Sequence, residues 1–178
     1  MSPEPCWITS PAGAVLQGEL LFGVIEVQVE IASIGTPDVA VREIVHPLAL
    51  VVSQDCDLDL DYKARTQGGA AHRLVDNVLL CDVDDAIEMR NRGGLSNARW
   101  RLVETFQNER YHVLQGLFGR MLGLDFRRVF TIPTAELYRR VEIGEATRLC
   151  FLSTLHRYHL SNRFYGYHMR VALEEEAE

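Results

Sequence analysis

Residues 18–32 read GELLFGVIEVQVEIA, and the second part of this stretch alternates between apolar and polar side chains. Isoleucine or valine stands at positions 25, 27, 29 and 31, with glutamate or glutamine between them. Successive side chains of a β-strand point to opposite faces, so this period of two is typical of a half-buried strand. The turn signal GTPD at 35–38 then precedes a second expected strand over residues 39–45.

The rest of the chain adds further strands and several helices around this start. Pro47 interrupts the chain, and the apolar run LALVV at 48–52 is expected to be a strand covered on both faces. A polar excursion at 53–61 and a loop at 66–71 follow. We expect further strands at 75–83, 111–114, 125–132 and 148–152. We expect helices at 84–92, at 96–107, from 133–137 onward and at 153–171. This order predicts an α+β fold with a C-terminal helix.

The length of 178 residues suits a single domain. We expect a loose leader over 1–17, a strand-rich part over 18–85, helices with completing strands over 86–173, and an acidic tail at 174–178. The sequence has no run of eighteen apolar residues and no basic segment followed by an apolar stretch at its start. We therefore expect no membrane span, no membrane partner and no secretory signal, and we expect the protein in the cytoplasm. The four cysteines form no C-x-x-C pair and are expected as buried, reduced thiols.

Charge is unevenly distributed along a chain whose net charge is −7. Residues 1–89 hold four basic and fifteen acidic side chains, whereas residues 90–178 hold fourteen basic and ten acidic ones. This asymmetry predicts an acidic pole and a basic pole. All but one of the basic residues are arginines, which suits bidentate contacts to carboxylate or phosphate and is equally typical of a GC-rich genome.

The most distinctive segment is HPLALVVSQDCDL at residues 46–58. A buried strand that ends in serine, glutamine, aspartate and cysteine is a common place for a catalytic or binding site, and Asp55, Cys56 and Asp57 are the candidates here. Flanking carboxylates disfavour the thiolate that a cysteine nucleophile needs. The alternative is that Asp55 and Asp57 cap a turn through backbone N–H groups while Cys56 packs inward.

Asp55, Asp57 and Asp59 also begin a D-x-D-x-D pattern like that of an EF-hand calcium loop. The pattern fails at its sixth position, which is Leu60 instead of glycine, and at its twelfth, which is Thr66 instead of glutamate. No cofactor is therefore expected. A divalent cation on these three aspartates is the one alternative, because clustered carboxylates need a counter-charge.

The expected last helix interleaves basic and aromatic residues. His156, Arg163 and Arg170 recur every seven residues and so share one face, with Arg157 beside them. Such a face suits stacking and phosphate contacts with an anionic partner. It equally suits a helix docked by its aromatics with the arginines in water. His156 and His159 alone do not make a metal site.

The openings GELLF and HPLALVVS resemble those of MazF/PemK-like toxins, and the longer HPLALVVSQDCDL is similar to uncharacterised bacterial proteins with an SQDCDL-type motif. The toxin resemblance implies an SH3-like β-barrel with appended helices, a homodimer, cleavage of single-stranded RNA, and a toxin–antitoxin or phage-defence setting. The family's catalytic arginine falls on His46, which has a reference pKa suited to acid–base chemistry. Its second catalytic group falls near Val83 or Asp84, and neither position keeps the family residue.

These observations favour a non-enzymatic binding module that engages a protein or nucleic-acid partner. The alternative is a hydrolase, either an RNase that uses His46 or a metal-dependent nuclease that uses the carboxylates of residues 55–61. A purely structural subunit is a third reading.

Overall fold

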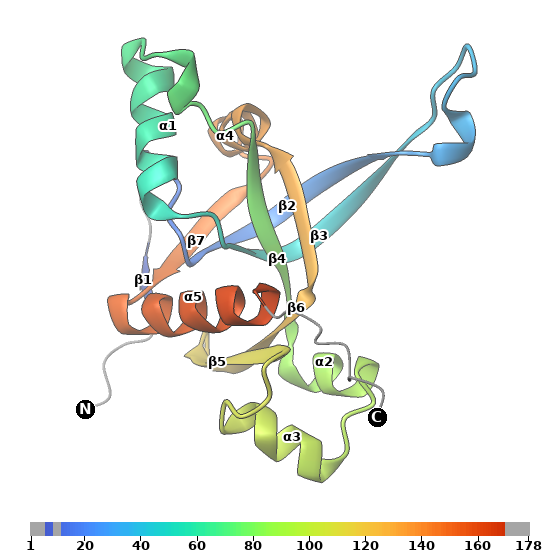
Figure 1. The fold of residues 1–178 in the computed structure, drawn as a ribbon, viewed down its shortest axis with the longest axis vertical. Coiled ribbons are helices and arrows are strands. Elements are labelled where there is room, and N and C mark those ends of the chain that lie inside the picture. The colour runs from blue at the N-terminus through green and yellow to red at the C-terminus, as the bar shows by residue number, and fades with distance from the viewer. Residues whose placement is uncertain (1–5, 9–11, 170–178) are drawn as a thin grey trace, which may run out of the picture.

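A single antiparallel sheet of seven strands organises the computed structural model, which describes residues 6–8 and 12–169 (Figure 1). The strands stand in the order β1-β7-β2-β3-β4-β6-β5. Their bounds are β1 Cys6–Ile8, β2 Glu19–Val29, β3 Val41–Val51, β4 Asn77–Asp85, β5 Tyr111–Leu117, β6 Arg120–Pro133 and β7 Thr147–Leu152. The helices are α1 Asp55–Gln67, α2 Ala86–Arg92, α3 Asn97–Glu104, α4 Thr134–Glu142 and α5 Thr154–His168, with short 3-10 turns η1 Ile31–Ser33 and η2 Ala71–Arg73. The mixed α/β class and the C-terminal helix are as the sequence predicts.

The sheet is open rather than closed. Its edge strands are β1 and β5, and within residues 6–8 and 12–169 no pairing joins them. The SH3-like barrel implied by the toxin resemblance is therefore not seen as a closed barrel.

Two apolar layers cover opposite faces of the sheet because neighbouring strand residues point to opposite sides. Leu20 belongs to the cluster that packs under α5, whereas the adjacent Leu21 belongs to the cluster under α1 and α4. The expected double coverage of residues 48–52 is confirmed, since Leu50 and Val51 join different clusters. A third, smaller core around Met89 fixes α2 and α3 at the other end of the sheet from α1 and α4 (Figure 1).

The start of the chain differs from the expected loose leader. Cys6–Ile8 pairs with β7 as an edge strand, and the N–H of Gly18 donates to the carbonyl of Val51 at 2.8 Å. Residues 6–8 are therefore part of the sheet, whereas residues 12–17 form no helix or strand. The acidic tail at 174–178 lies outside the described residues.

Pro47 does not end a strand, contrary to the expected interruption. β3 runs continuously from Val41 to Val51, and its outer neighbour β4 begins to pair only at Ala49. A proline without an N–H is tolerated at this point because β3 is still unpaired on that side.

The largest correction concerns residues 53–61, which were expected as a polar excursion. Asp55 to Gln67 form α1, and three residues of this helix, spaced every third position, are buried against the sheet: Leu58, Asp61 and Ala64. Gly68 ends the helix in the left-handed conformation at φ 75°. The remaining expected helices are confirmed, and Ser96 caps α3 as predicted by accepting from the N–H of Arg99.

No helix among the described residues is long and apolar enough to cross a membrane. The four cysteines are all free thiols. Cys81 and Cys150 are buried as expected, whereas Cys56 is exposed.

Candidate functional site

The longest hairpin extends beyond the body of the molecule. β2 pairs with β7 only through Phe22, and β3 pairs with β4 only from Ala49 onward. Between these points, within the described residues, the two strands pair only with each other, and Figure 1 shows the resulting ribbon projecting away from the sheet. We refer to residues 25–45 as the arm. Both of its backbone edges are therefore open, as in a strand edge that can accept another chain.

The register of the arm places apolar side chains together on one face. Val29 lies opposite Val41, and Ile25 lies opposite Val45. The four valines of this face are between 49% and 61% exposed; they are Val27, Val29, Val41 and Val45. The tip adds three more exposed residues, Ile31, Ile34 and Val39, of which Ile31 is 84% exposed. The alternation seen in the sequence is thus a true strand pattern, but its apolar side is not covered by the body.

The apolar surface of the arm is large enough to serve as an interface. Its seven exposed apolar side chains present roughly 700 Å², close to the share that one partner contributes to a standard protein–protein interface. An isolated two-stranded ribbon is only marginally stable in water. Exposed apolar side chains gathered on a projecting element, here around the single carboxylate of Glu43, are typical of an interaction site.

His46 lies at the base of the arm and ties it to the body. Its Nδ1 lies 3.3 Å from Oδ1 of Asp82, and its Nε2 lies 3.1 Å from Oε2 of Glu26. Its ring stacks on Phe130 with centroids 3.7 Å apart. Both ring nitrogens of His46 therefore lie within hydrogen-bonding distance of a carboxylate. His46 is 9% exposed, and it joins strands β2, β4 and β6 at the point where the arm leaves the sheet.

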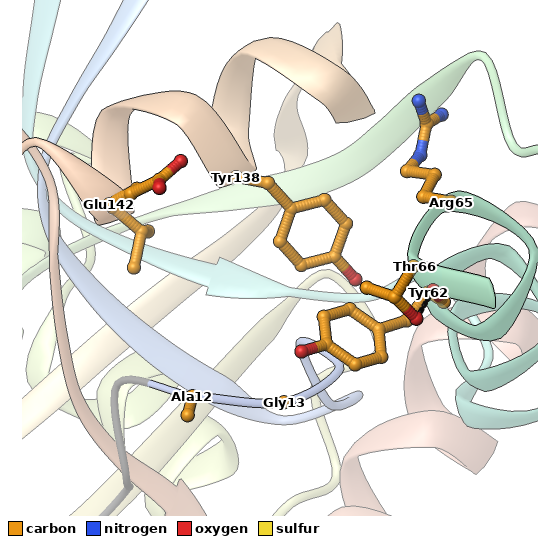
Figure 2. Close-up of a pocket in the computed structure, with 8 residues that line it drawn as sticks. Ala12, Gly13, Tyr62, Arg65, Thr66, Tyr138 and Glu142 are labelled. Atoms are coloured by element: carbon orange, nitrogen blue, oxygen red, sulfur yellow. Dashed lines mark hydrogen bonds between the residues drawn. The ribbon is translucent and has the colours of Figure 1, made fainter.

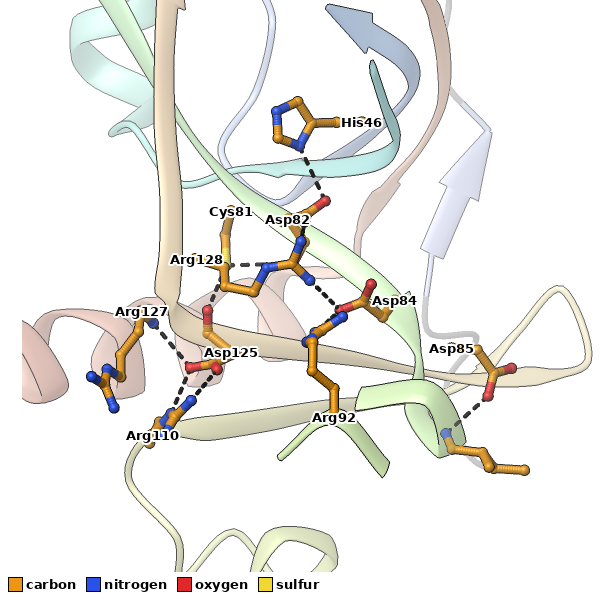
Figure 3. A network of polar contacts seen from close by, with 11 residues as sticks. His46, Cys81, Asp82, Asp84, Asp85, Arg92, Arg110, Asp125, Arg127 and Arg128 are labelled. Atoms are coloured by element: carbon orange, nitrogen blue, oxygen red, sulfur yellow. Dashed lines mark hydrogen bonds and ion pairs between the residues drawn. The ribbon is translucent and has the colours of Figure 1, made fainter. Parts of the chain in front are cut away.

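A chain of ion pairs continues from His46 across β4 and β6 (Figure 3). Arg128 pairs with both Asp82 and Asp84, and Arg92 pairs with Asp84. The neighbouring Cys81 is buried, and burial together with these carboxylates raises its pKa far above the ordinary range of a thiol. Cys81 is therefore an inert thiol in this network.

Asp125, on β6, is a further carboxylate at the far end of this network. Burial alone would raise the pKa of Asp125, but two hydrogen bonds from Arg110 and one from the N–H of Arg127 hold it below its usual value. The carboxylates of Asp82, Asp84 and Asp125 are each paired with an arginine. The network therefore stabilises the sheet and the root of the arm.

The aspartates at 55–61 do not form a common site. Asp55 accepts from the N–H of Gln17 at 2.5 Å and pairs with Arg157 at 2.6 Å. Cys56, beside it in the first turn of α1, is exposed, so the inward packing considered for this thiol is wrong. Asp57 stands in the same helical turn rather than in a capped loop.

The remaining aspartates of this segment are engaged separately. Asp59 pairs with Lys63 at 2.5 Å, and the buried Asp61 accepts from Arg65 and from the N–H of Val75. In a helix, side chains two positions apart point in different directions, so the D-x-D-x-D pattern cannot converge on one ion. Within residues 6–8 and 12–169 no three His, Cys, Asp or Glu residues gather so that they could hold a metal ion.

The basic residues predicted on the last helix hold parts of the same chain. His156 hydrogen-bonds to Ser153 at 2.8 Å, and Arg157 pairs with Asp55. Arg163 donates to the carbonyls of Phe106, Asn108 and Tyr111 and also lies over the Phe106 ring. Arg170, the fourth residue of the proposed face, lies outside the described residues. The described part of this face thus serves internal packing.

A cavity of about 510 Å³ opens between α1 and α4 (Figure 2). Tyr62 and Tyr138 line it with ring centroids 5.6 Å apart, and Tyr138 accepts from the N–H of Val15 at 3.3 Å. Arg65 also lines it but is engaged by Asp61. The cavity therefore presents aromatic walls without a converging set of catalytic groups.

His112 is a buried histidine that the sequence did not single out. It packs among Phe106, Phe126 and His159, and its Nδ1 has no hydrogen-bond partner among the described residues. Burial, with a smaller contribution from the nearby Arg163, lowers the pKa of His112 to about 3. The imidazole is therefore neutral in the folded protein at ordinary pH.

This burial predicts a pH-dependent stability. Below about pH 6.5 the unfolded chain takes up a proton at His112 that the folded chain refuses until about pH 3. The free energy of unfolding should thus fall by about 2 kcal/mol from about pH 7.5 to about pH 5. His112→Phe should remove most of this loss, as measured by urea unfolding at the two pH values. Equal slopes for both proteins would contradict the assignment.

The sequence reasoning missed the partners of His46. Asp82 and Asp84 stand two positions apart near the end of β4, and Arg128 stands in the neighbouring β6. The available signal was the set of three aspartates, at 82, 84 and 85, at the end of a strand that begins with a largely apolar run. Asp84 is part of the ion-pair network, whereas Val83 is buried in the core.

No protein-family model matches this chain, and no curated protein matches it significantly.

Proposed function

We propose that this chain is a protein-binding module whose arm docks against a partner protein. The observation that carries the proposal is the ribbon at residues 25–45, which combines open backbone edges with an exposed apolar face. Such an element supports binding both by strand addition at its edge and by burial of its valines.

The charge of the arm favours a protein partner over a nucleic acid. Residues 25–45 carry four carboxylates and one arginine, Arg42. Phosphate groups would be repelled by such a surface. The arginines of α5 that could have compensated are engaged with Asp55 and with backbone carbonyls.

The geometry gives less support to hydrolysis. His46 has both ring nitrogens against carboxylates, and the aspartates of α1 point apart. The resemblance to MazF/PemK-like toxins points to a cellular setting for this binding module. It suggests a cytoplasmic toxin–antitoxin or phage-defence system and an SH3-like ancestry for the open sheet.

Site-specific photocrosslinking tests the proposal. A photoreactive residue at Val39, at the exposed tip, should yield one defined crosslinked species in the source cell. The same residue at Thr66, which is exposed on α1, is the matched control and should not yield that species. Crosslinks that are absent from Val39, or identical from both positions, would argue against binding through the arm.

A further inference from the structure

We infer that the arm binds an extended segment of its partner along the β2 edge, and that this segment alternates aliphatic with basic or polar residues. The inference rests on the proposed binding function of the arm and names the edge and the chemistry of the partner. β7 pairs with β2 only as far as Phe22, which lies opposite Thr147. Beyond that point no strand of the described residues lies beside β2 on this side. An added strand would lie there in line with β7 and extend the sheet.

The backbone groups of this edge are arranged for an antiparallel partner. The N–H of Glu30 donates to the carbonyl of Ala40 at 2.9 Å, so these two residues form a hydrogen-bonded pair of the hairpin. Hydrogen-bonded pairs alternate along an antiparallel ladder, and the register of the hairpin is uninterrupted, so the residues at 28 and 26 also bond toward β3. The N–H and C=O groups that point to the open edge are therefore those of Ile25, Val27 and Val29.

The side chains of this edge are sorted between the two faces of the ribbon. Ile25, Val27 and Val29 lie on the apolar face of the arm. The residues between and after them, Glu26, Gln28 and Glu30, lie on the other face. Directly opposed side chains on one face are the pairs that stabilise a sheet. A strand added here therefore presents aliphatic side chains at every second position and polar ones between them.

The opposite edge of the arm, along β3, is less suited to strand addition. Pro47 stands at its base and has no N–H to donate. Glu43 also interrupts the apolar face, because it stands between Val41 and Val45 on the same side of the strand. The β2 edge has neither feature.

Charge selects basic side chains for two polar positions of the added strand. Glu30 is exposed and forms no ion pair with any described residue. Glu26 is largely held by His46 and Gln28, so Glu30 supplies most of the attraction. The one arginine of the arm, Arg42, lies on β3 and donates to Gln28 at 3.0 Å. The position opposite Gln28 therefore suits an uncharged polar residue, whereas those opposite Glu26 and Glu30 suit lysine or arginine.

This pattern defines a peptide probe. An antiparallel strand opposite residues 30 to 25 reads, from its N-terminus, basic, aliphatic, polar, aliphatic, basic, aliphatic. Arg-Val-Thr-Val-Arg-Val with blocked ends has this order, and Glu-Val-Thr-Val-Glu-Val is its control of opposite charge. We expect the full chain to bind the basic peptide about tenfold or more tightly than the acidic one. Amide hydrogen exchange should slow at Ile25, Val27 and Val29 and not at Glu43 or Val45.

Two matched pairs of variants test the edge and the charge. Val27→Pro removes an N–H from the β2 edge without loss of a hairpin bond and should weaken binding of the basic peptide about tenfold or more. Val45→Pro makes the same change on the β3 edge and should leave binding unchanged. Glu30→Arg should reverse the preference between the two peptides, whereas Glu43→Arg, at an exposed position of β3, should keep it.

Three results would overturn the inference. One is equal binding of the two peptides, or protection at Glu43 and Val45 in place of the β2 residues. Another is that neither peptide binds, in which case the binding function stands only if Val39 still yields its crosslinked species. The third is self-association of the full chain in sedimentation that Val27→Pro abolishes, since this would assign the β2 edge to a second copy.

Discussion

Replacing Arg148 by methionine is expected to reduce the free energy of unfolding by about 3–5 kcal/mol. Arg148 and Glu19 form an ion pair whose side chains are 3% and 0% exposed. The guanidinium also donates to the carbonyls of Gly13 and Ala14, each at 2.9 Å. Without the arginine, the carboxylate of Glu19 remains buried without its counter-charge, and the segment at residues 13–14 loses its attachment to β7.

The matched control is Arg139→Met on α4. Arg139 pairs with Glu136 at the surface, where such pairs contribute about 1 kcal/mol or less. Urea unfolding of both variants gives the comparison. If Arg148→Met lowers the free energy of unfolding by less than about 1 kcal/mol, the buried pair of Arg148 and Glu19 does not contribute to stability as we expect.

Arg163→Leu should destabilise the protein by about 2–4 kcal/mol, because the carbonyls of Phe106, Asn108 and Tyr111 lose their donor. Phe106 has a positive φ of 58°, and the bond from Arg163 helps to hold it there. The loop that joins α3 to β5 should then become mobile. Amide hydrogen exchange over residues 105–110 would report this directly.

Arg99→Leu, at an exposed position of α3, provides the control and should change stability by no more than about 0.5 kcal/mol. If Arg163→Leu has the stability of the wild type, the hydrogen bonds from Arg163 to the three carbonyls do not stabilise the fold. The basic face on α5 would then again be a candidate for an anionic partner.

Much of the fold could be predicted from hydrophobic periodicity. The strand over residues 19–29 and the C-terminal helix follow from patterns of apolar side chains. The helix α1 was missed because its sequence, DCDLDLDYKARTQ, is mostly polar and only three of its side chains are buried. One of these is Asp61, which pairs with Arg65 one helical turn later and also accepts from the N–H of Val75, a tertiary contact that no periodicity reveals.

The candidate site could be predicted only in part. The alternation at residues 25–31 predicts a strand but not its exposure, because exposure depends on where β7 and β4 stop pairing with the hairpin. His46 was named from the toxin resemblance, but its contacts with Glu26 and Asp82 depend on the register of three strands. Long-range pairing of this kind is set by the whole sheet.

The central claim is that the valine face of the arm binds a protein. The most direct test compares wild type with the double variant Val29→Thr/Val41→Thr, which removes two opposed methyl surfaces while keeping shape and strand propensity. Binding of the species crosslinked at Val39 should weaken at least tenfold, with an unchanged melting temperature, and Val78→Ile in the core should have no such effect on binding. Undiminished binding by the double variant would contradict the account.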